Sequence, residues 1–269
     1  MKIKVLLASA ILATVFVACE KETDTDPGNG TGTGTGTGSS QDTIAPMVFH
    51  FAVNSLSERA FVSVGTSPVV SIECSDNENL SSVGFSVTPN FEGFGEISTQ
   101  WAYSDAETVS GTFYSYTKTV GVPTNVNAGS YLAETAVLDS AGLEGLYYPI
   151  ELIITKVGQA AISLPDNPTN NPYTVSLQAS PSRFDLKARF DDGDALVYRR
   201  LEIEPKLVEA GKDAFYYDFE EEVSGLSSNR TYVNVIPDSV ATGLYEFTLS
   251  AGDSDGNVTF FFGELNITD

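Results

Sequence analysis

The feature that most constrains the fold of this chain is an internal repeat. Gly129-Ser130-Tyr131 is followed, eight residues after the tyrosine, by Asp139, and Gly243-Leu244-Tyr245 is followed at the same spacing by Asp253. Upstream, Cys74-x-Asp76-x3-Leu80-x4-Phe85-x-Val87 aligns without a gap with Phe190-x-Asp192-x3-Leu196-x4-Leu201-x-Ile203. Self-similarity at a fixed offset is the mark of a repeated structural unit. The repeat therefore predicts two domains that share one fold.

The hydrophobic pattern within each copy is typical of β-strands. In the second copy, Leu186, Ala188 and Phe190 alternate with charged residues. In the first copy, Val70 and Ile72 alternate with Val69, Ser71 and Glu73. A period of two residues places one face of a strand in a core and the other in solvent. No stretch has sustained helical spacing, so an all-β fold is expected.

The Gly-x-Tyr motifs carry a resemblance to a known family. They resemble the tyrosine corner of immunoglobulin-like (Ig-like) and fibronectin type III domains, in which the tyrosine hydroxyl fixes the corner before strand F. Antibody domains have a cysteine two residues later, whereas this chain has Ala133 and Phe247. The resemblance implies two tandem, disulfide-free Ig-like β-sandwiches of the kind found in bacterial surface proteins, with structural roles for Tyr131 and Tyr245.

The N-terminus has the pattern of a signal peptide. Lys2 and Lys4 flank the start of an apolar run, residues 5–18, that is shorter than the roughly 20 residues of a membrane-spanning helix. The run ends in Phe16-Val17-Ala18-Cys19, which resembles the lipobox of bacterial lipoproteins. That resemblance implies that lipid on Cys19 anchors the mature chain to the membrane. The alternative is an ordinary secreted protein cleaved near the same place.

The acidic residues that follow Cys19 bear on the location of the protein. The segment 20–24 contains Glu20, Glu22 and Asp24 beside Lys21, and it resembles the surface-export signal of some Gram-negative lipoproteins. The resemblance implies the outer membrane and its outward face. The alternatives are a solvated start to a linker and a periplasmic orientation.

Composition divides the rest of the chain. A Gly/Thr-rich stretch without apolar side chains cannot form a core and predicts a flexible tether. The expected organisation is a lipoprotein signal peptide at 1–18, a disordered tether at 19–41, a first sandwich at 42–157, a linker at 158–172 and a second sandwich at 173–269.

The net charge excludes one class of partner. The chain has 14 basic and 36 acidic residues, for a formal charge of −22 at pH 7. So acidic a surface repels phosphate backbones, and nucleic-acid binding is not expected.

The acidic loops are candidate calcium ligands. Ig topology brings the start of strand A, the B–C loop and the F–G loop to one pole of the sandwich. Ca²⁺ takes six to eight oxygen ligands, and clustered carboxylates supply them. The alternative is that these Asp residues only form turns, in which Asp and Gly are favoured. The candidate ligands are Asp42, Asp76 and Asp139, joined by Asn77, in the first copy, and Asp166, Asp192, Asp194, Asp253 and Asp255 in the second.

Aromatic residues offer a second kind of site. Trp101 and Tyr103 lie where an exposed platform for a sugar ring is possible, although core packing is the alternative use of such rings.

Catalysis has little support. His50 is the only histidine, and Cys74 alternates with apolar residues. The sequence predicts a non-catalytic surface lipoprotein that binds a protein or glycan ligand or mediates adhesion. The alternative is a glycan-binding accessory of an outer-membrane polysaccharide-uptake system.

Overall fold

The computed structural model describes residues 42–90, 99–165, 173–179 and 182–269. Residues Gln41–Asp269 form one compact unit. Where the structure describes the chain, no helix has the length and hydropathy needed to span a bilayer. Cys19 and Asp166 lie outside the described residues, as do the predicted signal peptide and tether.

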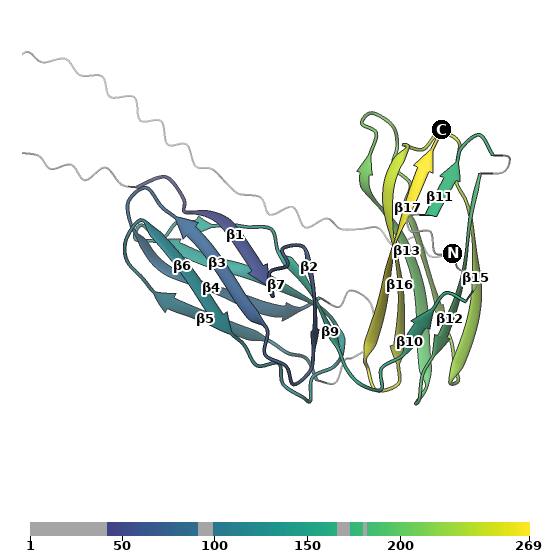
Figure 1. The fold of residues 1–269 in the computed structure, drawn as a ribbon, viewed down its shortest axis with the longest axis horizontal. Coiled ribbons are helices and arrows are strands. Elements are labelled where there is room, and N and C mark those ends of the chain that lie inside the picture. The colour runs from purple at the N-terminus through teal and green to yellow at the C-terminus, as the bar shows by residue number, and fades with distance from the viewer. Residues whose placement is uncertain (1–41, 91–98, 166–172, 180–181) are drawn as a thin grey trace, which may run out of the picture. The chain divides into compact units, whose positions relative to one another are not determined.

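The first copy is a two-sheet sandwich (Figure 1). One sheet has the order β1-β3-β6 and the other has the order β2-β9-β7-β4-β5, with the short β8 paired to β7. The strands are β1 (Met47–Val53), β2 (Arg59–Ser63), β3 (Val69–Ser75), β4 (Leu80–Pro89), β5 (Tyr103–Thr108), β6 (Phe113–Thr119), β7 (Gly129–Asp139), β8 (Glu144–Gly145) and β9 (Ile150–Thr155).

The second copy repeats this topology except for β8, which has no counterpart among its strands. One sheet has the order β10-β12-β15, and the other has the order β11-β17-β16-β13-β14. In both copies the first strand pairs antiparallel with one sheet and the next strand pairs parallel with the last strand of the other. The strands are β10 (Ala161–Ser163), β11 (Tyr173–Ser176), β12 (Arg183–Asp191), β13 (Leu196–Val208), β14 (Tyr217–Glu222), β15 (Ser227–Val235), β16 (Gly243–Asp253) and β17 (Val258–Thr268).

Each sandwich therefore has the Ig-like arrangement, and the all-β prediction is confirmed. Strand β12 shows why the sequence folds this way, because its burial alternates strictly along its length, with Leu186, Ala188 and Phe190 inward. The first copy buries Val70 and Ile72 in the same manner. The two cores are separate sets of apolar side chains, one in each sandwich. Since each core is complete, the fragment from residue 41 onward is expected to fold on its own.

The segment expected to be a linker, 158–172, contains a strand. Residues 161–163 form β10, which pairs with β12 through the register Ile162 to Phe190. The second sandwich therefore begins at Ala161 rather than at residue 173. Residues 161–163 are too few to show a hydrophobic alternation in the sequence. They are recognised as a strand only because they pair with β12, almost thirty residues later.

Candidate metal centre

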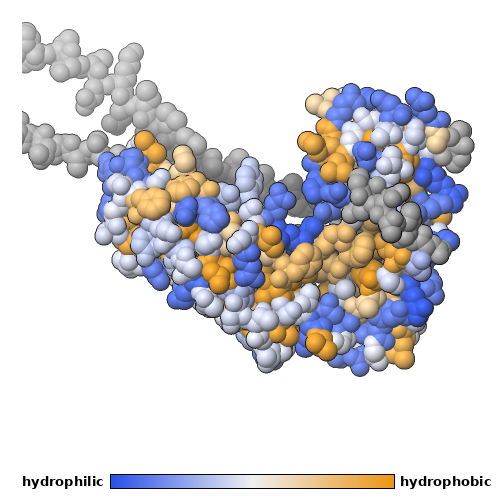
Figure 2. Space-filling view, viewed as in Figure 1, coloured by the Kyte–Doolittle hydropathy of each residue, from blue (hydrophilic) through white to orange (hydrophobic). Residues whose placement is uncertain are grey.

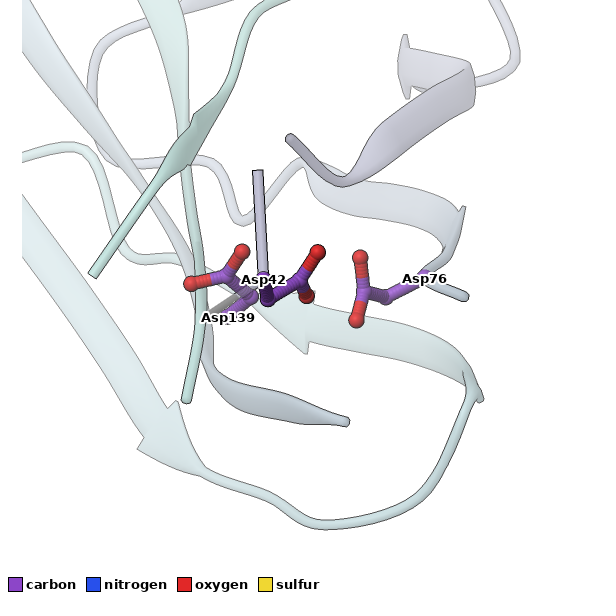
Figure 3. Close-up of side chains that lie close together, drawn as sticks. All are labelled: Asp42, Asp76 and Asp139. Atoms are coloured by element: carbon purple, nitrogen blue, oxygen red, sulfur yellow. The ribbon is translucent and has the colours of Figure 1, made fainter. Parts of the chain in front are cut away.

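Three carboxylates converge at one pole of the first sandwich (Figure 3). Asp42 precedes β1, Asp76 directly follows β3, and Asp139 is the last residue of β7. One potential ligand atom from each lies within 4.8 Å of the others. The sequence placed these three residues together, and the structure brings them together.

The backbone near Asp42 explains how the chain reaches this pole. A Cβ atom added at Gly145 would lie 2.6 Å from the carbonyl oxygen of Pro46. Only glycine lets the incoming segment lie so close to β8, which is paired with β7.

Each carboxylate uses one oxygen to fix its own loop. Asp76 Oδ2 accepts hydrogen bonds from the backbone N–H groups of Glu78 and Asn79, at 2.9 and 2.8 Å. Asp139 Oδ1 accepts one from the backbone of Leu143 at 2.8 Å. Asp42 Oδ1 accepts from the backbone N–H of Ile44 and from Asn77 Nδ2, at 3.1 and 3.2 Å.

The second oxygen of each carboxylate is buried and has no hydrogen-bond partner. These atoms are Asp42 Oδ2, Asp76 Oδ1 and Asp139 Oδ2. Asp139 is 1% exposed, and Asp42 and Asp76 are 8% and 9% exposed. Within the described residues, no Lys or Arg forms an ion pair with any of the three. A buried carboxylate oxygen without a donor or a counter-charge is costly, and a bound cation would offset that cost.

The geometry suits calcium. Oxygens bound to Ca²⁺ lie 2.3–2.6 Å from the ion, so two of them on opposite sides are about 4.6–5.2 Å apart. Ligand atoms that all lie within 4.8 Å of one another are close enough to reach one ion of this size. Three carboxylates leave coordination positions for water or carbonyl oxygens.

The second copy does not assemble the equivalent cluster among the described residues, which corrects the expectation for that copy. Asp194 and Asp255 are exposed. Asp253 Oδ1 accepts from the backbone of Asp255 and of Asn257, and its Oδ2 accepts from Asn257 Nδ2 at 2.9 Å. The oxygen that is unpartnered in Asp139 is therefore satisfied by an amide in Asp253.

Asn257 also links the second pole to the first sandwich. Its Oδ1 accepts a hydrogen bond from the backbone N–H of Ala128 at 3.1 Å, and Asn127 Nδ2 donates to the Asp255 carbonyl at 3.0 Å. Sequence spacing alone did not reveal that Asn257 satisfies Asp253 and bonds to the first sandwich. Asp192 remains buried at 8% exposure, with both carboxylate oxygens unpartnered.

The predicted sugar platform is wrong in its first residue. Trp101 is 6% exposed and belongs to the first core, where its ring packs 6.2 Å from Tyr131. Tyr103 is half-buried and packs 5.5 Å from Phe85. Both rings are used in the packing of the first core, Trp101 within it and Tyr103 against it.

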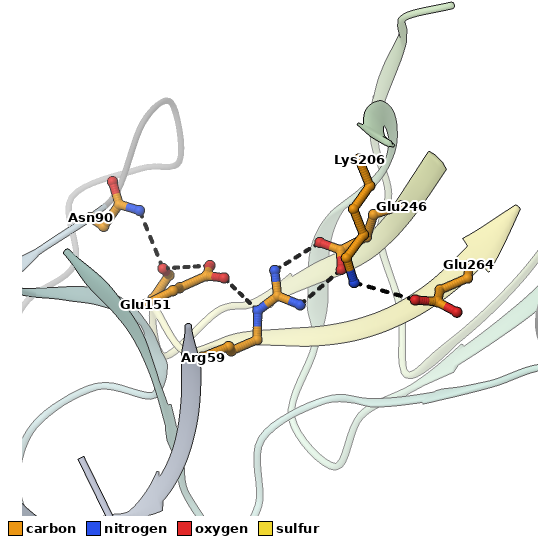
Figure 4. A network of polar contacts seen from close by, with 7 residues as sticks. Arg59, Asn90, Glu151, Lys206, Glu246 and Glu264 are labelled. Atoms are coloured by element: carbon orange, nitrogen blue, oxygen red, sulfur yellow. Dashed lines mark hydrogen bonds and ion pairs between the residues drawn. The ribbon is translucent and has the colours of Figure 1, made fainter. Parts of the chain in front are cut away.

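A charged network at the domain junction was not anticipated from the sequence (Figure 4). Arg59 on β2 donates from Nε to Glu151 and, through its two terminal nitrogens, to both oxygens of Glu246 on β16, at 3.1 and 2.8 Å. Ser130 Oγ donates to the other Glu151 oxygen at 3.1 Å. Bidentate pairing of this kind fixes orientation as well as adding energy.

Comparisons with known proteins identify no family. No family model matches the chain, and no curated protein matches it. Several solved structures show a distant similarity to the chain, with low identities and TM-scores. The fibronectin(III)-like modules of Clostridium thermocellum CbhA are 12% identical over 82% of this chain and 94% of theirs, with a TM-score of 0.26.

Two further solved structures give similar values. A protein of unknown function from Porphyromonas gingivalis is 10% identical over 82% of this chain and 99% of its own, with a TM-score of 0.32. The calcium binding domain CBD12 of CALX1.1 is 12% identical over 73% of this chain and 78% of its own, with a TM-score of 0.23. Likenesses this distant carry no argument about function.

Proposed function

We propose that this chain is a non-catalytic lipoprotein of the outer membrane, anchored through lipid on Cys19, that displays two Ig-like sandwiches at the cell surface for binding or adhesion. The first sandwich holds a calcium ion between Asp42, Asp76 and Asp139. The observation that carries the proposal is the set of three buried, unpartnered carboxylate oxygens at this pole.

The position of Asp42 links calcium to display. Asp42 is the first described residue after the tether, whereas Asp76 and Asp139 belong to the body of the sandwich. A cation bound by all three residues would connect the incoming chain to the body of the sandwich. This connection lies at the point where a force on the tether would act on the domain. Extracellular modules bind Ca²⁺ with dissociation constants of about 10⁻⁴ to 10⁻³ M, so calcium outside the cytoplasm would fill the site.

Two groups support the non-catalytic part of the proposal. His50 Nε2 lies 3.0 Å from Ser71 Oγ on the neighbouring strand. Among the described side chains, no carboxylate hydrogen-bonds to His50 to complete a catalytic triad. Burial raises the pKa of the Cys74 thiol to about 11, so the thiol is hardly ionised at neutral pH and is a poor nucleophile.

The alternative function is that of a glycan-binding accessory of a polysaccharide-uptake system. The sugar-binding platform expected for it at Trp101 is not available, because Trp101 is buried. A glycan ligand for the displayed unit then has to bind elsewhere on the surface.

The anchoring is tested by fractionating cells that express Cys19→Ser. We expect the wild-type chain in the outer-membrane fraction and the variant released from it, because residues 5–18 are too short to span the bilayer. Membrane retention of the variant contradicts the lipid anchor. Protease treatment of intact cells then tests display, since a periplasmic protein would be fully protected.

A further inference from the structure

A strip of aromatic side chains runs along the outward face of β17. Phe260 and Phe262 lie on this face, while Phe261 between them packs against the second core. The rings of Phe260 and Phe262 are 6.0 Å apart at their centroids and inclined by only 12°. Figure 2 shows a hydrophobic area over the part of the second sandwich where β16 and β17 run. The strip is therefore a flat apolar surface rather than part of a core.

One ring of the strip is already covered by a flat polar group. The guanidinium carbon of Arg59 lies 3.5 Å from the centroid of Phe262. The neighbouring ring, Phe260, borders a pocket of about 280 Å³ that also has Arg59 in its wall. At about 30 Å³ per water molecule, this volume corresponds to roughly nine waters. Phe260 thus lines a space large enough for a small ring.

Polar groups surround this face in two rows that cross the sheet. Strand register places Arg200, Ser250 and Phe260 in one row, and Glu202, Thr248 and Phe262 in the next. All six line the pocket. Arginine donates, carboxylate accepts, and hydroxyl does both. Burial raises the pKa of Glu202, whose side chain is 30% exposed.

Three of the four carboxylates that line the pocket are paired with arginines, and the fourth, Glu204, forms no ion pair with another described residue. Glu151 and Glu246 pair with Arg59, and Glu202 pairs with Arg200. A cationic ligand would find only one carboxylate here, that of Glu204, whose charge is not already neutralised by an arginine. A neutral ligand with many hydroxyl groups needs donors and acceptors side by side, and these ion pairs provide both.

We propose that this pocket binds a sugar ring of a neutral polysaccharide, with the C–H face of the ring stacked on Phe260. The ring hydroxyls hydrogen-bond to Arg200, Glu202 and Thr248. This inference rests on the proposed display function and names the class of ligand that the displayed unit would bind. Aromatic faces next to a few placed polar groups are typical of small-molecule sites.

The test is affinity electrophoresis of the Gln41–Asp269 fragment through gels containing starch, mannan, xylan or mixed-linkage β-glucan. We expect at least one polysaccharide to retard the fragment. Phe260→Ala should weaken that retardation roughly tenfold, the effect of losing one stacked ring. Phe260→Tyr keeps the ring and should preserve binding.

Controls separate this site from misfolding and from other surfaces. Phe49, 45% exposed on β1 of the first sandwich, gives a matched variant, Phe49→Ala, that should bind like the wild type. The melting temperature of Phe260→Ala reports whether it folds. Three results would overturn the proposal: no retardation by any of the four polysaccharides, equal retardation of Phe260→Ala and wild type, or binding to oligolysine alone. None of these results affects the fractionation of Cys19→Ser, which tests display separately.

Discussion

The hydroxyl of Tyr131 donates a hydrogen bond to the carbonyl of Asn127, four residues earlier, at 2.9 Å. Tyr245 donates in the same way to Ala241 at 2.7 Å, so both copies have the tyrosine corner that the Gly-x-Tyr motifs predicted. Each hydroxyl also bonds a backbone group two residues before a strand, at Trp101 or at Phe215. Both tyrosines are fully buried.

Replacing either tyrosine by phenylalanine should destabilise its sandwich. Tyr245→Phe leaves the Ala241 carbonyl and the Phe215 N–H without this partner, and we expect a loss of about 1–3 kcal/mol in the free energy of unfolding. Tyr131→Phe should behave similarly. Urea denaturation measures both, and Tyr148→Phe, at 84% exposure, is the control that should change nothing. Unchanged unfolding of both core variants would show that the corners contribute no stability.

Calcium should stabilise the Gln41–Asp269 fragment. With about 5 mM CaCl₂ and a dissociation constant of about 10⁻⁴ to 10⁻³ M, binding to the folded state adds about 1–2 kcal/mol, or several degrees in melting temperature. The comparison is with EDTA at ionic strength matched by NaCl, because screening also relieves repulsion in an acidic chain.

Asp139→Asn gives the calcium prediction its specific control. The asparagine can keep the oxygen that accepts from Leu143 and replaces the unpartnered oxygen by an amide. This variant should lose most of the calcium shift and should melt higher than wild type in EDTA, since one of three like charges is gone. Asp194→Asn makes the same charge change at an exposed site and should keep the shift. Equal melting in CaCl₂, EDTA and matched NaCl would mean that the three carboxylates only form turns.

Asp192→Asn should stabilise the second sandwich by roughly 1 kcal/mol at neutral pH, because a neutral amide costs less to bury than a carboxylate without donors. The change should also act on Asp253, whose pKa is raised by burial and, in smaller part, by the charge of Asp192. NMR titration should therefore find a lower pKa for Asp253 in the variant. A fall in stability would show that Asp192 has a favourable role in the wild type.

Asp105 should make stability fall in acid. The pKa of Asp105 is lowered by a hydrogen bond from the Tyr116 hydroxyl and then by Lys118. A carboxyl group with a depressed folded-state pKa stabilises the protein above its unfolded pKa of about 3.9, and this contribution is lost as the pH falls through the folded value. Tyr116→Phe removes the larger cause. Its deficit against wild type should thus be smaller at pH 2–3 than at pH 6, as measured by chemical denaturation. A pH-independent deficit would assign the effect to packing alone.

Much of the fold follows from local sequence. The repeat at Tyr131 and Tyr245 predicted two copies of one unit. The alternation along residues 184–190 predicted both that this segment is a strand and which of its faces points into the core. The first acidic pole was also predictable, because Ig topology brings the ends of strands B and F together whatever the loops contain. These features depend on side-chain periodicity and on chain connectivity, which can be read without coordinates.

Tertiary structure alone decided how the copies differ. Asp139 and Asp253 occupy the same place in the repeat, but Asn257 satisfies the second oxygen of Asp253 and is itself held by Ala128, 129 residues away. Whether a ring is buried, as Trp101 is, or lies on the outer face of a sheet, as Phe260 does, likewise depends on which face of each sheet packs against the other sheet. Hydrogen-bond satisfaction and burial are set by groups distant in the chain, so periodicity carries no information about them.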